Sequence, residues 1–176
     1  MSDEAHTGGT FWGWVGALWG VLGVSFLLGF AIWRLAPLAW TALQMDLSIL
    51  QWIALVVWVL FMGVAEGYRG FQKAFSPRVA ARCRHLRDHP TVLRVLTAPI
   101  FAMAFYAAPR KRRIAAFALT FGVILLVILV HQLDQPWRGI IDAGVVLGLF
   151  WGWISLVIFW FQAMTQDTFF ASPEVA

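Results

Sequence analysis

The chain has 176 residues, of which 61% are hydrophobic and only 12% are charged. Soluble domains are about half apolar, so this composition excludes a typical soluble domain and predicts a membrane protein. The formal net charge is +4, and the presence of a single cysteine, Cys83, excludes an internal disulfide.

Four apolar runs are long enough, or nearly so, to cross a membrane, because a hydrocarbon core of about 30 Å needs about 20 helical residues. They cover residues 11–35, 47–65, 114–133 and 143–163. The sequence therefore predicts an all-α, polytopic helical membrane protein with four transmembrane helices, in a single membrane domain over residues 1–176. The tail before the first run is acidic, so we expect this run to be retained rather than cleaved as a signal peptide.

Glycines recur along the first run at spacings of three, four and three residues: Gly13, Gly16, Gly20 and Gly23. Small residues at such spacings let membrane helices approach one another closely. We expect this face to pack inside the bundle, and the alternative is a dimerisation face.

The second run ends at a carboxylate, Glu66, which is followed by Gly67, Arg69 and Gly70. We expect the two glycines to let the chain turn sharply onto the membrane plane, and we expect Arg69 to pair with Glu66. Charge beside a membrane span needs a partner or a purpose, so Glu66 is also a candidate functional charge on a proton or ion pathway.

The connection over residues 66–113 carries eleven of the thirteen lysines and arginines: Arg69, Lys73, Arg78, Arg82, Arg84, Arg87, Arg94, Arg110, Lys111, Arg112 and Arg113. Basic residues in short loops are retained on the cytoplasmic side of a membrane. We therefore expect this connection to be cytoplasmic. With four spans, both termini are then cytoplasmic as well.

Within this connection, Ser76 and Pro77 form a helix-start signal. On a helix over residues 77–88, one apolar face is rimmed by arginines: Val79, Cys83 and Leu86, with Arg78, Arg82, Arg84 and Arg87 on its flanks. This pattern favours a helix lying in the membrane surface, and the alternative is a solvated basic helix that only fixes the orientation. The predicted lipid or partner contacts are Arg69, Lys73, Arg78, Arg82, Arg84 and Arg87.

Residues 91–109 form a shorter apolar segment that contains Pro99 and is bounded by Arg94 and Arg110. We expect a second interfacial or re-entrant segment on the cytoplasmic face, and a fifth span is the alternative. His85 and His89 stand four residues apart, as metal-binding helical pairs do, but they lack a clear third ligand. We predict no metal, catalytic or cofactor site.

The connection before the fourth run carries three charges, Asp134, Arg138 and Asp142. We expect ion pairs that hold the helix ends, and Asp142 meets the positive end of a helix dipole there. A proton or ion pathway is the alternative. The fourth run then repeats glycine every four residues, at Gly144, Gly148 and Gly152, which predicts close helix packing.

The motifs EGYRGFQKAFSPR and LDQPWRGIIDAGVVLGLFWG resemble those of a family of small, uncharacterised bacterial inner-membrane proteins. The resemblance extends from about residue 65 to residue 153. It implies a multi-span protein of the bacterial inner membrane and a functional role for the motif residues, but it implies no activity.

The sequence contains no catalytic constellation, and we expect a non-enzymatic accessory or scaffold subunit. Its expected partners are membrane lipids, mainly anionic, or a membrane protein, met through the basic connection. A homo-oligomer is compatible with the glycine faces, and no nucleic-acid partner is expected. The alternative is a small oligomeric transporter or channel, and a third hypothesis is a membrane enzyme that acts on lipid headgroups.

Overall fold

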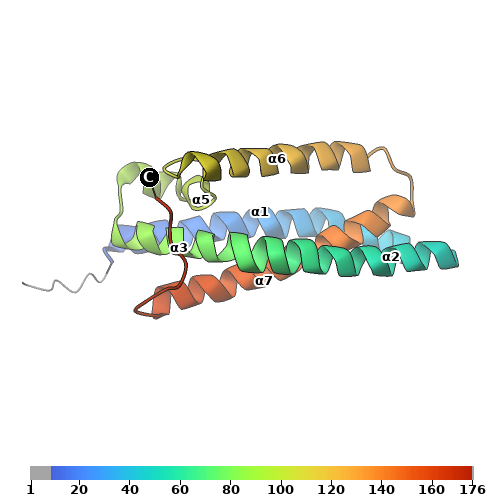
Figure 1. Ribbon diagram of the computed structural model, residues 1–176, viewed down its shortest axis with the longest axis horizontal. Helices are drawn as coiled ribbons and strands as arrows, with labels where there is room; N and C mark the ends of the chain where they lie inside the picture. Colours follow the sequence, from blue (N-terminus) through green and yellow to red (C-terminus); the bar gives the residue numbers. More distant parts are fainter. Residues whose placement is uncertain (1–8, 176) are drawn as a thin grey trace, which may run out of the picture.

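The computed structural model describes residues 9–175, and these contain helices and connecting segments but no strand. The acidic tail before Gly9 lies outside the described residues. The elements, in chain order, are α1 (Phe11–Leu43), α2 (Ile49–Met62), η1 (Gly63–Phe75), α3 (Ser76–Asp88), α4 (Val92–Leu96), α5 (Ala98–Ala102), α6 (Arg110–Val130) and α7 (Trp137–Thr165) (Figure 1). Within these residues four helices are long and apolar enough to cross a membrane: α1, the continuous helix Ile49–Asp88, α6 and α7. This confirms the all-α polytopic fold.

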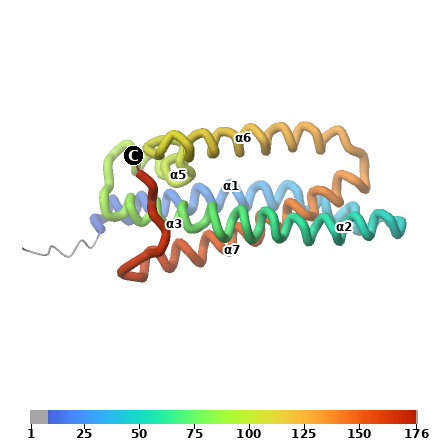
Figure 2. Tube along the Cα trace, viewed as in Figure 1, coloured from blue at the N-terminus to red at the C-terminus, as the bar shows by residue number. Residues whose placement is uncertain are grey.

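Three long helices form the bundle: α1, α7, and the helix made by α2, η1 and α3 together. The fourth long helix, α6, runs alongside them but stands apart from the bundle (Figures 1 and 2). The short helices α4 and α5 pack on α1. The molecule therefore consists of a closely packed three-helix bundle and one long helix, α6, that stands apart from it.

One end of the molecule collects the start of α1, the end of α3, the start of α6 and the end of α7 (Figure 1). We call it the basic end, because α3 and the first turn of α6 carry most of the basic residues. The connections from α1 to α2 and from α6 to α7 lie at the opposite end. Figure 2 shows the C-terminal tail (residues 166–175) crossing the basic end from α7 toward the start of α6.

The expected sharp turn at Gly67 and Gly70 is wrong. The chain stays helical from Ile49 to Asp88, a stretch of 40 residues, because the wider π-helical winding of η1 carries it through the glycines. Gly67 is buried, and a Cβ on it would lie 3.1 Å from Trp151 Cβ on α7. This glycine serves a close helix contact instead of a turn.

The apolar stripe of α3 faces protein and not a membrane surface, which corrects the expected interfacial helix. Val79, Cys83 and Leu86 are at most 1% exposed. The glycine face of α1 lies against them, since a Cβ on Gly20 would lie 3.1 Å from Cys83 Sγ and one on Gly16 would lie 3.1 Å from Leu86 Cδ2. Because one continuous helix runs from α2 through η1 into α3, the apolar stripe of α3 meets the rest of the bundle.

The glycine face of α7 is filled by the long central helix. A Cβ on Gly144 would lie 2.6 Å from the Trp58 ring, and one on Gly148 would lie 3.2 Å from Glu66 Cβ. The Trp58 indole also donates a hydrogen bond of 3.0 Å to the carbonyl of Ile141. The three α7 glycines thus lie in an intramolecular contact.

The segment 91–109 is not a fifth span. Its helices, α4 and α5, have five residues each, far fewer than the roughly 20 that a crossing needs. They fold back on α1, where the Trp19 indole donates a 3.3 Å hydrogen bond to the carbonyl of Leu96. The rest of the segment is a turn that leads into α6.

Candidate functional site

A buried arginine organises the basic end. Arg82 on α3 is only 2% exposed, and its three guanidinium nitrogens donate five hydrogen bonds of 2.7–3.2 Å to backbone carbonyls: those of Phe101, Tyr106, Ala107, Pro173 and Glu174. The guanidinium also lies 4.2 Å from the centroid of the Phe101 ring. Arginine has five N–H donors, so these carbonyls provide enough acceptors to replace its hydration shell.

The acceptors around Arg82 come from three separate pieces of chain: the end of α5, the turn before α6, and the C-terminal tail. In the turn, Ala104 and Ala107 adopt positive φ angles of 64° and 47°, a conformation that costs a non-glycine residue about 1–2 kcal/mol. The Tyr106 and Ala107 carbonyls both accept from Nη2 at 3.0 Å. Arg82 therefore offsets the strain of the turn and joins it to the tail.

Two further arginines of α3 hold the end of α7 and the start of the tail. Arg84 donates to the carbonyls of Gln166, at 2.9 Å, and Asp167. Arg87 donates to the Met164 carbonyl at 3.1 Å and to the Asp88 carboxylate at 2.7 Å. Carbonyls at a helix C-terminus have no partner within the helix and favour cations.

These contacts correct the expectation for Arg82, which is buried; for Arg84 and Arg87, which are half-buried, lipid or partner contact stays a prediction. The guanidinium groups of all three serve as internal clamps, whereas the sequence placed them on an outward-facing rim. Arg69 and Lys73 remain exposed on η1, and the Lys73 ammonium lies 4.6 Å from the centroid of the Tyr68 ring. Arg78 is half-buried. Lipid or partner contact also stays a prediction for Arg69, Lys73 and Arg78.

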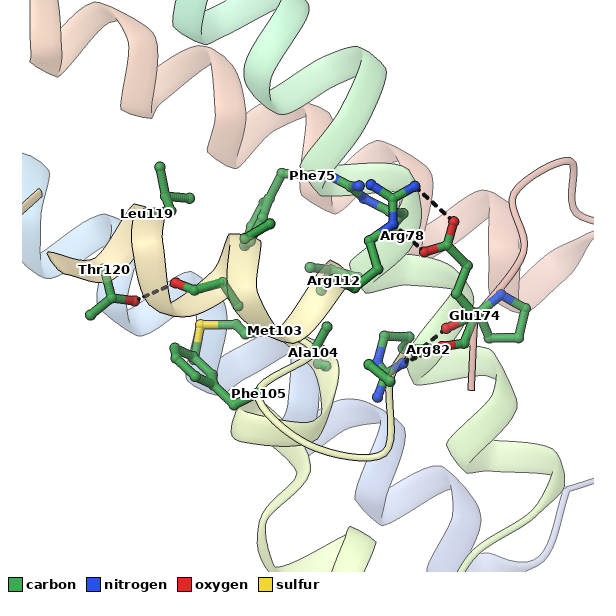
Figure 3. A pocket seen from close by; sticks show the side chains of 16 residues that line it. Phe75, Arg78, Arg82, Met103, Ala104, Phe105, Arg112, Leu119, Thr120 and Glu174 are labelled. Atoms are coloured by element: carbon green, nitrogen blue, oxygen red, sulfur yellow. Dashed lines mark hydrogen bonds and ion pairs between the residues drawn. The ribbon is translucent and has the colours of Figure 1, made fainter. Parts of the chain in front are cut away.

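Beside Arg82 lies a pocket of about 150 Å³ between α3, the turn, α6 and the C-terminal tail. Figure 3 shows that the pocket is polar on one side and apolar on the other. The charged side chains are Arg78, Arg82, Arg112 and Glu174, and the apolar side includes Phe75, Met103, Phe105 and Leu119. The pocket is therefore amphipathic, with a charged side and an apolar side.

The tail closes the charged side of this pocket. Glu174 accepts two hydrogen bonds from Arg112, at 2.5 and 2.9 Å. The bonds from Arg112 hold the pKa of the Glu174 carboxyl below its ordinary value of 4.5. Two of the Arg82 bonds described above also go to the tail carbonyls of Pro173 and Glu174, so this end of the tail is fixed at two points.

The charges at the opposite end form a loose cluster. The Arg138 Nε lies 3.9 Å from Asp142 Oδ2, and Asp142 is 4% exposed. Neither of these two atoms has a hydrogen-bond partner among the described residues. Arg138 Nη2 also lies 3.3 Å from the His131 ring nitrogens. The expected pairing thus joins Arg138 to Asp142, and Asp134 stays exposed outside this contact.

Glu66 lies on η1 against Gly148 of α7. A Cβ atom added to Gly148 would lie 3.2 Å from Glu66 Oε2. The expected pair with Arg69 is absent from the ion pairs of residues 9–175. Arg69 is exposed, whereas Glu66 is half-buried. Glu66 remains a carboxylate between packed helices.

Sequence reasoning missed the roles of Arg112, Phe101 and Glu174. Arg112 was visible only as one member of a basic block, and Glu174 only as an isolated charge near the end of the chain. Nothing in the sequence pattern distinguishes Arg112 from Arg113, because the choice depends on which of the two faces the tail.

His85 and His89 stack their rings 4.7 Å apart, next to Arg94, whose Nη1 lies 3.4 Å from His85 Nε2.

Comparisons of the chain with family models, curated proteins and solved structures found no match.

Proposed function

We propose that this chain is a non-enzymatic accessory or scaffold subunit of the bacterial inner membrane, from the family that its two motifs resemble. Its basic end and both termini lie on the cytoplasmic side. There it contacts anionic lipid or a membrane partner through the basic groups that remain outside the internal clamps: Arg69, Lys73, Arg78, Arg110, Lys111 and Arg113.

The observation that carries this proposal is the exposure of α6. From Arg110 to Leu129 every residue of α6 is exposed except the half-buried Ala116. An apolar helix surrounded by so little of its own protein needs lipid chains or another membrane protein on its sides. The three-helix bundle, in contrast, packs its small residues internally and leaves α6 as the open element.

The charge distribution supports the orientation. The basic block at the start of α6 lies at the same end as α3 (Figure 1). Basic loops are retained on the cytoplasmic side, which supports a cytoplasmic position for this end. Anionic headgroups attract each nearby basic residue by about 1 kcal/mol. The basic groups outside the internal clamps can thus hold this end against an anionic membrane surface.

The test is mild-detergent extraction of the full chain from its own membrane, followed by native mass spectrometry. We expect anionic phospholipid and a stoichiometric membrane subunit to stay bound. A photo-crosslinking residue at Phe121, exposed on α6, should label the same subunit, and one at the buried Leu156 on α7 should not. A protein that carries neither lipid nor subunit, with adducts absent from both positions, would contradict the accessory role.

A small oligomeric transporter or channel remains a second candidate, favoured by Glu66. This carboxylate lies between η1 and α7 without an ion-pair partner among the described residues, and charges inside membrane helices mark ion pathways. Vesicles that contain only this protein distinguish the two functions. Proton or cation flux that Glu66→Gln abolishes would support the transporter and exclude a purely accessory role.

A further inference from the structure

We infer that the pocket between α3, α6 and the C-terminal tail binds the headgroup of an anionic phospholipid, and that Glu174 competes with this headgroup. The inference rests on the proposed function, because it names the lipid contact that the proposal leaves general. It assigns that contact to a defined site in place of a diffuse basic surface.

Charge is the first argument. Three arginines and one carboxylate line the pocket, so the formal charge of the lining is 3 − 1 = +2. Among residues 9–175, Arg78 has no ion-pair partner and Arg82 binds only neutral carbonyls. Glu174 is held by Arg112. A phosphate group in the pocket could therefore pair with Arg78, which has no ion-pair partner within the described protein.

The apolar side identifies the ligand as a lipid. The pocket is bounded by the first turns of α6, from Arg112 to Thr120, which is where the basic block ends and the apolar part of the helix begins. Phe75, Met103 and Leu119 lie on the side away from the arginines (Figure 3). A cavity of about 150 Å³ holds a molecule the size of benzene. It can therefore take a headgroup phosphate or the first carbons of a chain, while the rest of the chain lies along the exposed side of α6.

The tail carboxylate occupies the place of a headgroup oxygen. Arginine binds carboxylates and phosphates through the same paired N–H···O geometry, and Glu174 uses this geometry on Arg112. A lipid phosphate that reaches Arg112 must displace Glu174 or share the guanidinium with it. Loss of the Glu174 charge should therefore strengthen lipid binding, whereas loss of the Arg78 charge should weaken it.

The experiment titrates the full chain in mild detergent with dioleoylphosphatidylglycerol and measures the apparent Kd by native mass spectrometry. Arg78→Gln should weaken binding about fivefold, as expected for about 1 kcal/mol per charge. Glu174→Gln should strengthen it by about the same factor. Arg34→Gln is the matched control, since it removes the same charge from an exposed position on α1, outside the pocket and outside the proposed lipid contacts, and it should leave the Kd unchanged. Arg113→Gln, which removes a surface charge outside the pocket, should weaken binding less than Arg78→Gln.

Each variant is first shown to keep the thermal unfolding midpoint of the unmodified protein. Equal weakening by Arg78→Gln and Arg113→Gln would overturn the pocket in favour of general surface attraction. Displacement of the lipid by inorganic phosphate would overturn the lipid assignment, and weaker binding in Glu174→Gln would overturn the competition. If these differences vanish while anionic lipid and the membrane subunit still copurify, the pocket fails and the accessory role stands.

Discussion

At the scale of single residues, Arg82 decides how the basic end is built. A charged group inside a protein is tolerated only when hydrogen bonds replace its hydration, and five carbonyls supply these bonds here. None of the five belongs to α3 itself. The same side chain therefore both satisfies its own burial and brings distant parts of the chain together.

Replacement of Arg82 tests this role. Arg82→Gln leaves most of the five carbonyls without a donor, and we expect a loss of about 2–4 kcal/mol, since each buried unpaired group costs about 1–3 kcal/mol. Arg82→Lys keeps the charge but loses the planar fork, so it should lose less. The measurement is thermal unfolding in detergent, followed by tryptophan fluorescence. Arg69→Gln, on the exposed side of η1, is the control, and an equal effect there would refute the internal role of Arg82.

The ion pair between Arg112 and Glu174 predicts a dependence on pH. The pKa of Glu174 is lowered in the folded protein by its bonds to Arg112. The pair is therefore fully present above the unfolded pKa of about 4.5 and is lost as the pH falls through the lower, folded pKa. A fluorophore on Ser172→Cys should gain rotational freedom, seen as falling anisotropy, over this acidic range. The same label combined with Glu174→Gln should show low anisotropy at neutral pH and little further change on acidification.

At the scale of elements, the contact between α7 and the long central helix depends on small residues. Helix association in a membrane relies on van der Waals contact, because lipid chains are as apolar as the side chains. The backbones approach closely at Gly144, Gly148 and Gly152, where Trp58, Glu66 and Phe71 fill the space. The Ser76 hydroxyl adds a buried hydrogen bond of 3.2 Å to the carbonyl of Gly152.

A leucine at Gly148 should separate these helices. Its side chain has to displace Glu66, whose Cβ and Oε2 would lie only 3.2 Å from a Cβ at this position, and overpacking of this kind costs about 1–3 kcal/mol. We expect a lower thermal unfolding midpoint in detergent. The matched control is Gly122→Leu on α6, because nothing lies within 4 Å of a Cβ at that position. A midpoint that falls equally in both variants would argue against the packing role of Gly148. A change in self-association with Gly122→Leu alone would instead indicate a contact between copies through α6.

At the scale of the whole molecule, the four long helices place their connections at two ends. Because successive long helices run in opposite directions, the start of α1 and the end of α7 both lie at the basic end (Figure 1). The proposed orientation then puts the connection between α6 and α7 on the outer face of the inner membrane. Cys83 is buried, so introduced cysteines are the ones that report accessibility.

Labelling of intact cells with a membrane-impermeant maleimide tests the orientation. Gln132→Cys, exposed at the opposite end, should react in whole cells. Lys111→Cys and Thr168→Cys, exposed at the basic end, should react only after the membrane is opened. Reaction of Lys111→Cys in whole cells would reverse the proposed orientation, and reaction of Lys111 and Thr168 variants from opposite sides would contradict the arrangement of the helices.

The length of the apolar runs is enough to predict the number of spans and the helical class, because each run has to leave water whatever the other runs do. The glycine spacings in α1 and α7 pointed to close approach, but they could not name the partner helix. The failure came at Gly67 and Gly70, where local preference indicates a turn and packing against Trp151 keeps a helix. The pocket was beyond prediction, since Arg82, Arg112 and Glu174 are brought together only by the path of the turn and the tail.

The 40-residue helix is too long for the membrane it crosses. At 1.5 Å per residue it measures about 60 Å, and even at a tilt of about 40°, the upper end of the usual range, a core of about 30 Å covers only about 39 Å of it. Roughly 21 Å, or about 14 residues, must then project into the headgroups and the water beyond. This is close to the 13-residue length of α3. Charge is costly in hydrocarbon, and α3 carries four arginines whereas α2 carries no charged residue, so the excess length belongs at the α3 end. In the proposed orientation Arg82 then sits above the hydrocarbon, and a change in bilayer thickness would raise or lower its pocket relative to the lipid surface.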